Sequence, residues 1–304
     1  MLLKTNSFNY EINTHLLKNN HFTKIVKALI LFYLYPNMIQ IADIKRTTYI
    51  ENGVPFEMVT VEKRAKEEGE YDFIMGDDES SYDYEKPAHP VAFKNDFEIG
   101  KYPVTQAIWE AVMGKDNNPS HFKGTNRPVE QVSWNDIQIG DKEKGIAAFL
   151  DKLNAIQKIK AKNLAEGKQF RLPTEAQWEY AAHGGKYWKE LNYKYAGSNQ
   201  LKEVGWDWKN SHRGTKPVGL KMPNVLGLCD MSGNVWEWCE DSWHENYKGA
   251  PEDGTVWLSE KDEDIRVVRG GSWLLSDEDC LVVGRNTANS DERGDFVGFR
   301  LFRY

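Results

Sequence analysis

The chain has 304 residues, of which 40% are hydrophobic and 12% aromatic, so it is long enough to bury a sizeable core. Its formal net charge of −7 argues against a general nucleic-acid-binding protein, because contacts to phosphate need a basic face. The three cysteines, Cys229, Cys239 and Cys280, are too few for a disulfide scaffold, and their odd number leaves at least one thiol free. Cys229 and Cys239 are predicted to be buried thiols, with a disulfide between them as the alternative.

Residues 1–50 form an N-terminal segment in which several lysines precede the apolar run Ala28–Tyr35. This run is shorter than the ~20 residues of a membrane-spanning helix and matches the apolar part of an export signal. Against this, Glu11 dilutes the basic character, and the best residue for cleavage, Ala42, has Gln40 two positions before it. We predict export to the cell surface or outer membrane. The alternative is a short buried or amphipathic helix in a cytoplasmic protein.

Two hairpins are predicted at the start of the main domain. The stretches 54–60 and 71–76 have the composition of strands, and the charged residues Glu62–Glu70 would join them as one hairpin. Apolar residues alternate with polar ones over 89–104, as in a second, half-buried hairpin.

Four helices are predicted from capping residues and from the spacing of apolar side chains, over residues 106–114, 134–137, 146–156 and 175–183. Thr105 and Ser133 would cap the first two. Thr174 and Gln177 have the spacing of a capping box before the fourth helix, and Gly184 would end it.

From residue 186 onward helical periodicity nearly disappears, and no internal repeat or linker divides the chain, so residues 51–304 are predicted to form one α+β domain. Near its end, Arg266–Val268 and Val297–Phe302 read as strands around a segment with neither helical nor strand period. Gly270 and Gly271 permit a turn that would project the following residues toward one face. This segment is the candidate site.

Seven phrases, taken in order, resemble the formylglycine-generating (sulfatase-modifying factor) family. They are FIMG at 73–76, FEIGKYPVTQAIW at 97–109, RPVEQVSWNDI at 127–137, FRLPTEAQWEYAAHGG at 170–185, GLCDMSGNVWEW at 227–238, VRGGSW at 268–273 and GFRLFR at 298–303. The resemblance implies the α+β, C-type lectin-like fold in its formylglycine-generating enzyme subclass, rich in loops and with its N- and C-terminal strands paired.

In that family the enzymes oxidise a cysteine with molecular oxygen and use two copper-binding cysteines after the GGS turn. The matching positions here are Leu275 and Cys280, so the first cysteine is absent. A single thiolate does not supply the paired soft ligands that Cu(I) favours, so no copper is expected and the chain is predicted not to be an enzyme. A copper-dependent oxidase of the formylglycine-generating type is the alternative.

A second resemblance fits the C-terminal stretch better. GGSW, a cysteine seven residues later, Arg285 and the phrase SDERGDFVGFR are similar to the variable proteins of diversity-generating retroelements, of the Treponema type. The resemblance implies a rigid lectin scaffold whose last segment, about 266–304, is rewritten, and it implies ligand binding without catalysis. The expected partner is a protein or glycan on another cell or host surface, bound by a monomer that contacts no nucleic acid.

The candidate ligand-binding residues, called here the display residues, follow from their place in this motif. They are Trp273, Leu274, Leu275, Asp277, Asp279, Leu281, Gly284, Asn286, Thr287, Ala288, Asn289, Gly294, Asp295 and Phe296. Trp273 also counts among the frame residues, which would hold the shape. The others are Gly270, Gly271, Ser272, Cys280, Arg285, Asp291, Arg293, Gly298, Phe299 and Arg300. Within the frame, the three arginines are predicted to pair with Asp291. Without the resemblance, an ordinary exposed loop would explain 274–296 equally well.

The turn DMSGNVWEW is the candidate metal site. In the family this turn offers carbonyls and a carboxylate to a structural Ca²⁺, and Asn234 and Glu237, with carbonyls near Gly233 and Val235, match that pattern. Hard oxygen donors suit calcium. The alternative is that Asn234 caps a tight turn while tryptophans on either side fill the core. None of the seven histidines lies in a ligand-spaced pair, which disfavours a zinc site.

Overall fold

The computed structural model describes residues 44–64, 70–141, 147–260 and 264–304. The apolar run Ala28–Tyr35 lies outside the described residues, and so does Ile146 at the predicted start of the third helix. Ile44–Tyr304 make one compact unit. Among the described residues, no helix has the length and apolar character that a membrane crossing requires.

A five-stranded antiparallel sheet joins the two ends of this unit. Its order is β1-β2-β5-β11-β6. The strands are β1 Arg46–Glu51, β2 Val54–Val61, β5 Phe97–Gly100, β11 Phe302–Arg303 and β6 Phe170–Arg171. The first and last strands of the unit therefore share a sheet, with β2 and β5 between them. No sequence pattern predicts β1, because Tyr49 is its one buried residue and its apolar residues therefore do not alternate with polar ones.

The two predicted hairpins are wrong, although their strands are real. β3 (Phe73–Met75) pairs with β4 (His89–Val91), and β2 pairs with β5. Side chains from both pairs belong to one hydrophobic cluster. Alternation therefore marks the extended segments, but it carries no information about which buried strand lies beside which.

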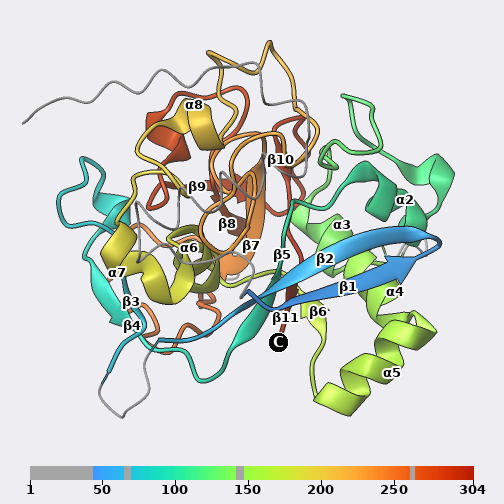
Figure 1. Cartoon of the computed structure of the whole chain (residues 1–304), viewed down its shortest axis with the longest axis horizontal. Helices are drawn as coiled ribbons and strands as arrows, with labels where there is room; N and C mark the ends of the chain where they lie inside the picture. The colour runs from blue at the N-terminus through green and yellow to red at the C-terminus, as the bar shows by residue number, and fades with distance from the viewer. Residues whose placement is uncertain (1–43, 65–69, 142–146, 261–263) are drawn as a thin grey trace, which may run out of the picture. The chain divides into compact units, whose positions relative to one another are not determined.

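The helices follow the capping signals closely. They are α2 Gln106–Met113, α3 Trp134–Gln138, α4 Phe149–Ala155, α5 Gln157–Glu166, α6 Glu175–Ala182, α7 Trp188–Leu191 and α8 Leu201–Val204. The caps at Thr105 and Ser133 and the capping box of Thr174 and Gln177 are confirmed. α5 was not predicted, since only two of its residues are buried. Figure 1 shows α2–α5 gathered on one side and α6–α8 on the other.

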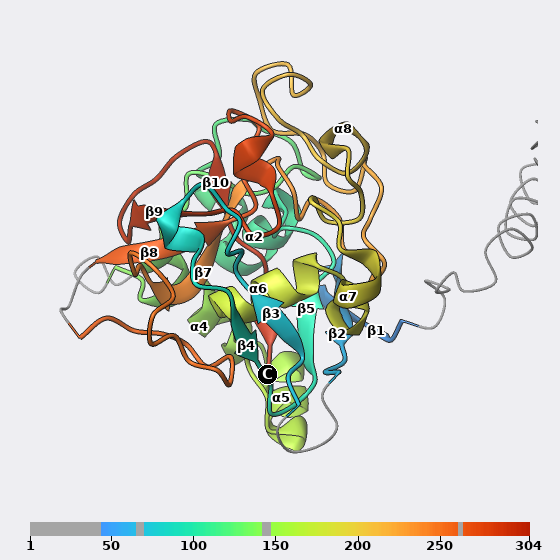
Figure 2. The same cartoon turned by 90° about the vertical axis from the view of Figure 1, so that its left-hand side faces the viewer.

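A second, four-stranded sheet carries the candidate site. Its order is β10-β7-β8-β9. The strands are β10 Val297–Gly298, β7 Trp236–Ser242, β8 Ile265–Arg269 and β9 Arg285–Asn289. β8 confirms the strand predicted at Arg266–Val268. β9 lies in the segment predicted to be irregular, and it is the outer strand of this sheet, at the left of Figure 2.

The strand predicted at Val297–Phe302 is two short strands. β10 pairs in parallel with β7, and β11 pairs with β5 and β6, so the chain passes from one sheet to the other. The three residues between them, Phe299, Arg300 and Leu301, are buried. One continuous strand cannot serve both sheets, and the apolar run therefore breaks in the core between them.

Helix α6 lies at the centre of the packing. All eight of its residues are buried, and it contacts β3, β7 and β8. Trp178 from this helix and Trp238 from β7 are among the largest fully buried side chains, together with Arg269, Arg300 and Arg303. Buried charges of this kind require ionised partners, and those partners determine how the candidate site is held.

Candidate ligand-binding site

Residues 273–296, which carry the display residues and are called here the display segment, follow a turn that only glycine allows. Gly270 and Gly271 follow β8 with φ of +96° and +74°. A Cβ on Gly271 would lie 2.5 Å from the Cys280 sulfur and 2.8 Å from the Asp279 carbonyl oxygen. A side chain here would therefore be strained and would also displace the next turn.

Trp273 joins the beginning of the display segment to its end. Its Nε1 donates to the carbonyl of Asp295 at 2.9 Å, its backbone N–H donates to Asn234 at 2.9 Å, and its ring meets Phe122 edge to face. Only 8% of Trp273 is exposed. Trp273 therefore behaves as a frame residue whose ring underlies the candidate surface.

The display segment is held largely by its main chain. The carbonyl oxygens of five display residues accept hydrogen bonds that fix its course. At the start of the segment, Trp273 accepts from Ser211 Oγ and Leu275 accepts from Trp208 N. At its end, Gly294 accepts from Gln131 N, Asp295 from Trp273 Nε1 and Phe296 from Trp236 N. β9 adds a main-chain ladder to β8. Because every residue has a carbonyl, these bonds do not depend on most of the display side chains.

Most display side chains reach solvent. Leu274, Asn286, Thr287 and Asn289 are exposed. A further group is half-buried, comprising Leu275, Asp277, Asp279, Leu281, Ala288, Asp295 and Phe296. Trp273, Gly284 and Gly294 are buried. The frame is mainly buried, with Asp291 and Arg293 as its exposed members. Ligand contact by the display residues stays a prediction.

The predicted pairing of the frame arginines with the Asp291 carboxylate is wrong, although Arg293 donates to the Asp291 backbone carbonyl at 3.4 Å. Arg285 binds both carboxylate oxygens of Glu175, at 2.6 and 2.7 Å. Arg300 binds Glu237 in the same bidentate way, at 2.9 and 2.8 Å, and Arg293 binds Asp136. These acids come from α6, β7 and α3, far away in sequence, so nearness along the chain pointed to the wrong partner.

A buried ion-pair network anchors the display segment to α6. Arg269 of β8 pairs with Glu175 and Glu179 of this helix, while Arg285 of β9 pairs with Glu175. Tyr247 also donates to Glu175, at 3.1 Å. Burial raises the pKa of Glu179, but the charge of Arg269, together with His183 and a hydrogen bond from the Gly76 backbone, brings that pKa below its ordinary value. The network therefore fixes β8, which precedes the display segment, and the start of β9, which lies within it.

The two positions of the family's cysteine pair differ in this chain. Cys280 is fully buried beside Tyr195, Leu201 and Val204, and burial raises the pKa of its thiol. Leu275 is half-buried and packs on the main hydrophobic cluster. Cys229 and Cys239 are also free and buried, which confirms the buried-thiol interpretation.

Two side chains of the predicted calcium site, those of Glu237 and Asn234, are already bonded to other groups of the protein. The carboxylate of Glu237 already accepts from Trp178 Nε1 at 2.7 Å and is neutralised by Arg300. The Asn234 side chain bonds the main chain of Lys216 through both its oxygen and its nitrogen. Within the described residues, no group of three or more His, Cys, Asp or Glu side chains is placed to hold a metal. Calcium binding stays a prediction, and no role is derived for it.

One loop at the site was missed by the sequence analysis. Trp208 is 58% exposed, and its backbone N–H donates to Leu275 at 3.0 Å. Lys209 pairs with Asp277 at 2.9 Å, and Ser211 donates to the carbonyl of Trp273. This loop belongs to the stretch after residue 186 that has little helical periodicity, and nothing in its composition shows which segment it contacts.

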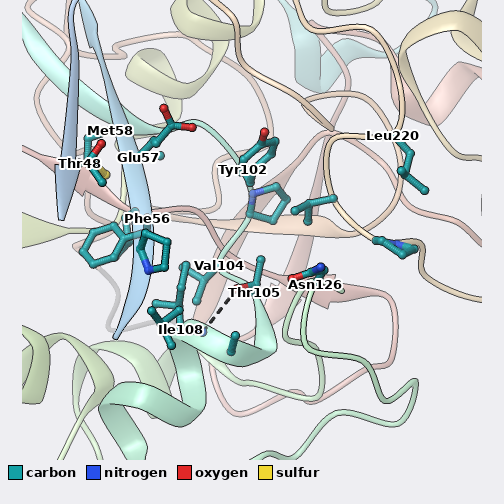
Figure 3. Close-up of a pocket in the computed structure, with 18 residues that line it drawn as sticks. Thr48, Phe56, Glu57, Met58, Tyr102, Val104, Thr105, Ile108, Asn126 and Leu220 are labelled. Atoms are coloured by element: carbon teal, nitrogen blue, oxygen red, sulfur yellow. Dashed lines mark hydrogen bonds between the residues drawn. The ribbon is translucent and has the colours of Figure 1, made fainter. Parts of the chain in front are cut away.

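An apolar pocket of about 580 Å³ lies apart from the display residues. It is lined by β2, by residues 100–108 and by the loop at 217–220, and Figure 3 shows Phe56 and Leu220 at opposite sides of it. Glu57 and Lys101 form an ion pair at 2.7 Å beside it. Its described lining includes no display residue.

Residues 56–304 match the model of the sulfatase-modifying factor enzyme 1-like domain. The chain belongs to this family. It is similar to Treponema denticola variable protein 1, with a TM-score of 0.67 and 30% identity over 84% of this chain and 98% of that one. The predicted fold and the resemblance to variable proteins are thus confirmed.

The chain is also similar in sequence to two further proteins, and it matches a different share of each. The chain is 36% identical to chaperone protein LppX of Paenibacillus barcinonensis over 69% of this chain and 80% of that protein. It is 30% identical to the formylglycine-generating enzyme of Thermomonospora curvata over 65% of this chain and 61% of that enzyme. The chain is therefore similar to an enzyme as well as to a variable protein.

Arg285→Met is expected to lower the free energy of unfolding by about 3–5 kcal/mol, because it leaves Glu175 charged and buried with one fewer partner. Arg293→Met is the matched control. Its pair with Asp136 is half-exposed and should contribute less than about 1 kcal/mol. Urea unfolding of both variants gives the comparison. Equal losses would show that the buried pair does not anchor the site.

The free energy of unfolding is expected to fall as the pH rises from about 4 to 7, because two buried acids lose their protons over this range. Burial, followed by the charge of Glu175, raises the pKa of Asp241 from 3.8 to about 7, and burial raises that of Asp230 to about 6. Since the folded chain binds these protons more tightly than the unfolded one, their contribution is complete below pH 4 and lost above these pKa values.

Urea unfolding at several pH values measures the slope of the free energy of unfolding against pH. Asp241→Asn should flatten this slope between pH 4 and 7. Asp253→Asn should leave it unchanged, since hydrogen bonds from Thr255 and Lys94 hold the pKa of Asp253 at about 2, below this window. An unchanged slope in Asp241→Asn would contradict the assignment.

Proposed function

We propose that this protein is a non-catalytic, ligand-binding display protein whose C-terminal segment is diversified by a retroelement. The observation that carries the proposal is how the display segment is held. Main-chain carbonyls and buried frame side chains fix its course, while most display side chains are exposed or half-buried. Such a segment can change its side chains and keep its shape.

The likeness to a variable protein supports this proposal, with 98% of that chain covered. The display side chains are chemically mixed, with leucines, carboxylates, amides and a phenylalanine. A binding surface tolerates such a mixture, whereas an active site requires particular groups. We further propose a monomer that is exported and that binds a protein or glycan on another surface.

A copper-dependent oxidase is the second candidate, favoured by the family's enzymes. Leu275 cannot ligate copper, and the Cys280 thiol is fully buried among apolar side chains. Two thiolates are the ligands that Cu(I) favours, and here one is missing and the other inaccessible. These features favour binding over oxidation.

The gene's surroundings test diversification directly. Sequencing the DNA next to the gene is expected to find a near-copy of the codons for 266–304 beside a reverse-transcriptase gene. That copy should carry adenines where the two sequences differ, and the differences should fall at display residues. A neighbourhood without the copy and the reverse transcriptase would overturn the retroelement proposal and leave the fold unaffected.

Oxygen uptake tests the alternative. The full chain, supplied with Cu(I) and a cysteine-containing peptide, is expected to consume no more oxygen than the copper and peptide alone. The Thermomonospora curvata enzyme provides the positive control. Copper-dependent uptake above background, with aldehyde formed on the peptide, would establish the oxidase and contradict the display proposal.

A further inference from the structure

We infer that the ligand site extends beyond the C-terminal segment onto the loop 206–213, where Trp208 is a fixed contact residue. The partner that fits this surface is a protein presenting an apolar side chain next to a cationic one. The inference rests on the proposed function, because it adds a second, invariant side to the same site.

The loop bonds to three alternate residues of the display segment, Trp273, Leu275 and Asp277. Trp208 N donates to the carbonyl of Leu275, Ser211 Oγ donates to that of Trp273, and Lys209 pairs with the Asp277 side chain. The first two bonds use main-chain acceptors. They persist when the side chains at display positions change, so the loop keeps its place beside any version of the segment.

Trp208 is unusually accessible for a residue fixed in this way. Its exposure is 58%, and that of Leu274, next to its bonding partner Leu275, is 49%. Lys209 lies 5.9 Å from the centre of the Trp208 ring. The main-chain bond to Leu275 thus brings the loop with an exposed tryptophan to the stretch with an exposed leucine. Exposed apolar side chains of this kind anchor protein interfaces, where tryptophan is enriched among the energetically dominant residues.

Left-handed backbone occurs in the loop 206–213 and at two residues that bond the display segment. His212 and Arg213 are consecutive exposed residues with φ of +52° and +59°. Gln131 and Asn234, which bond Gly294 and Trp273, also have positive φ. Such conformations are unfavourable for residues other than glycine, and they gather at sites where function requires a fixed shape.

The charge beside Trp208 selects the partner. Asp277, Glu278 and Asp279 are consecutive carboxylates at the helical turn η6 (Glu278–Cys280), and Lys209 neutralises the first of them. Against these three carboxylates the loop sets Lys209 and the exposed Arg213, so the surface has an excess of one negative charge beside an apolar contact. A cationic side chain next to an aliphatic or aromatic one complements both features, whereas a neutral glycan complements neither the charge nor Leu274.

The test uses a phage-displayed library of random peptides selected on the full chain. Selected peptides are expected to combine Lys or Arg with a neighbouring large apolar residue. A synthetic peptide from this set should bind at least about tenfold more weakly to Trp208→Ala, and Trp208→Phe should restore much of the affinity. Thermal unfolding of Trp208→Ala should match the parent, since the side chain is mostly in solvent.

Two control variants make the outcome specific. Leu164→Ala changes an exposed leucine on α5, and Leu220→Ala changes the edge of the apolar pocket, so neither should alter affinity for the peptide. Loss of binding in Leu220→Ala alone would place the peptide in that pocket and overturn the inference. Selection of acidic peptides, or binding of neutral glycans on an array in place of peptides, would overturn the partner class.

Leu274→Ala separates this inference from the proposed function. If it weakens binding and Trp208→Ala does not, the display segment binds alone and the extension to the loop is wrong. If neither variant weakens binding, the peptides bind elsewhere, and the proposed function loses its site as well. Weakening by both variants supports the extended site.

Discussion

The buried pairing of Arg269 and Arg285 with the carboxylates of α6 is the interaction on which the candidate site depends. Two guanidinium groups and two carboxylates are removed from water together, so each remains ionised only while its partners stay in place. The bidentate contact of Arg285 with Glu175 sets the start of β9. Buried residues, which a ligand does not contact, therefore determine the course of the display segment.

The same arrangement makes the course of the display segment largely independent of the side chains that it carries. Donors outside the display segment bond the carbonyls of Leu275, Gly294 and Phe296, which every amino acid supplies. The exceptions are instructive. Asp277 pairs with Lys209, and Asp279 accepts from Ser276, so these two positions contribute through their side chains. A change at either alters a local contact, while the main-chain bonds on both sides keep the segment in position.

The sequence predicts the parts of this fold that local chemistry determines. The capping box at Thr174 and the stop at Gly184 need only a few neighbouring residues, and both are present. β9 was missed because its polar residues lack apolar alternation and its pairing to β8 is a long-range contact. The acids that bind Arg285 and Arg300, and the loop of Trp208, lie far away in sequence, where no local pattern reports contact.

The most direct measurement of the central claim is a comparison of two libraries displayed on cells. One randomises the exposed display residues Leu274, Asn286, Thr287 and Asn289, and the other randomises the buried frame residues Gly270, Gly271, Arg285 and Arg300. Most members of the first library are expected to fold and to melt within a few degrees of the parent, while few members of the second should fold. Equal loss of folded protein in both libraries would show that the exposed display residues determine the fold as much as the buried frame does.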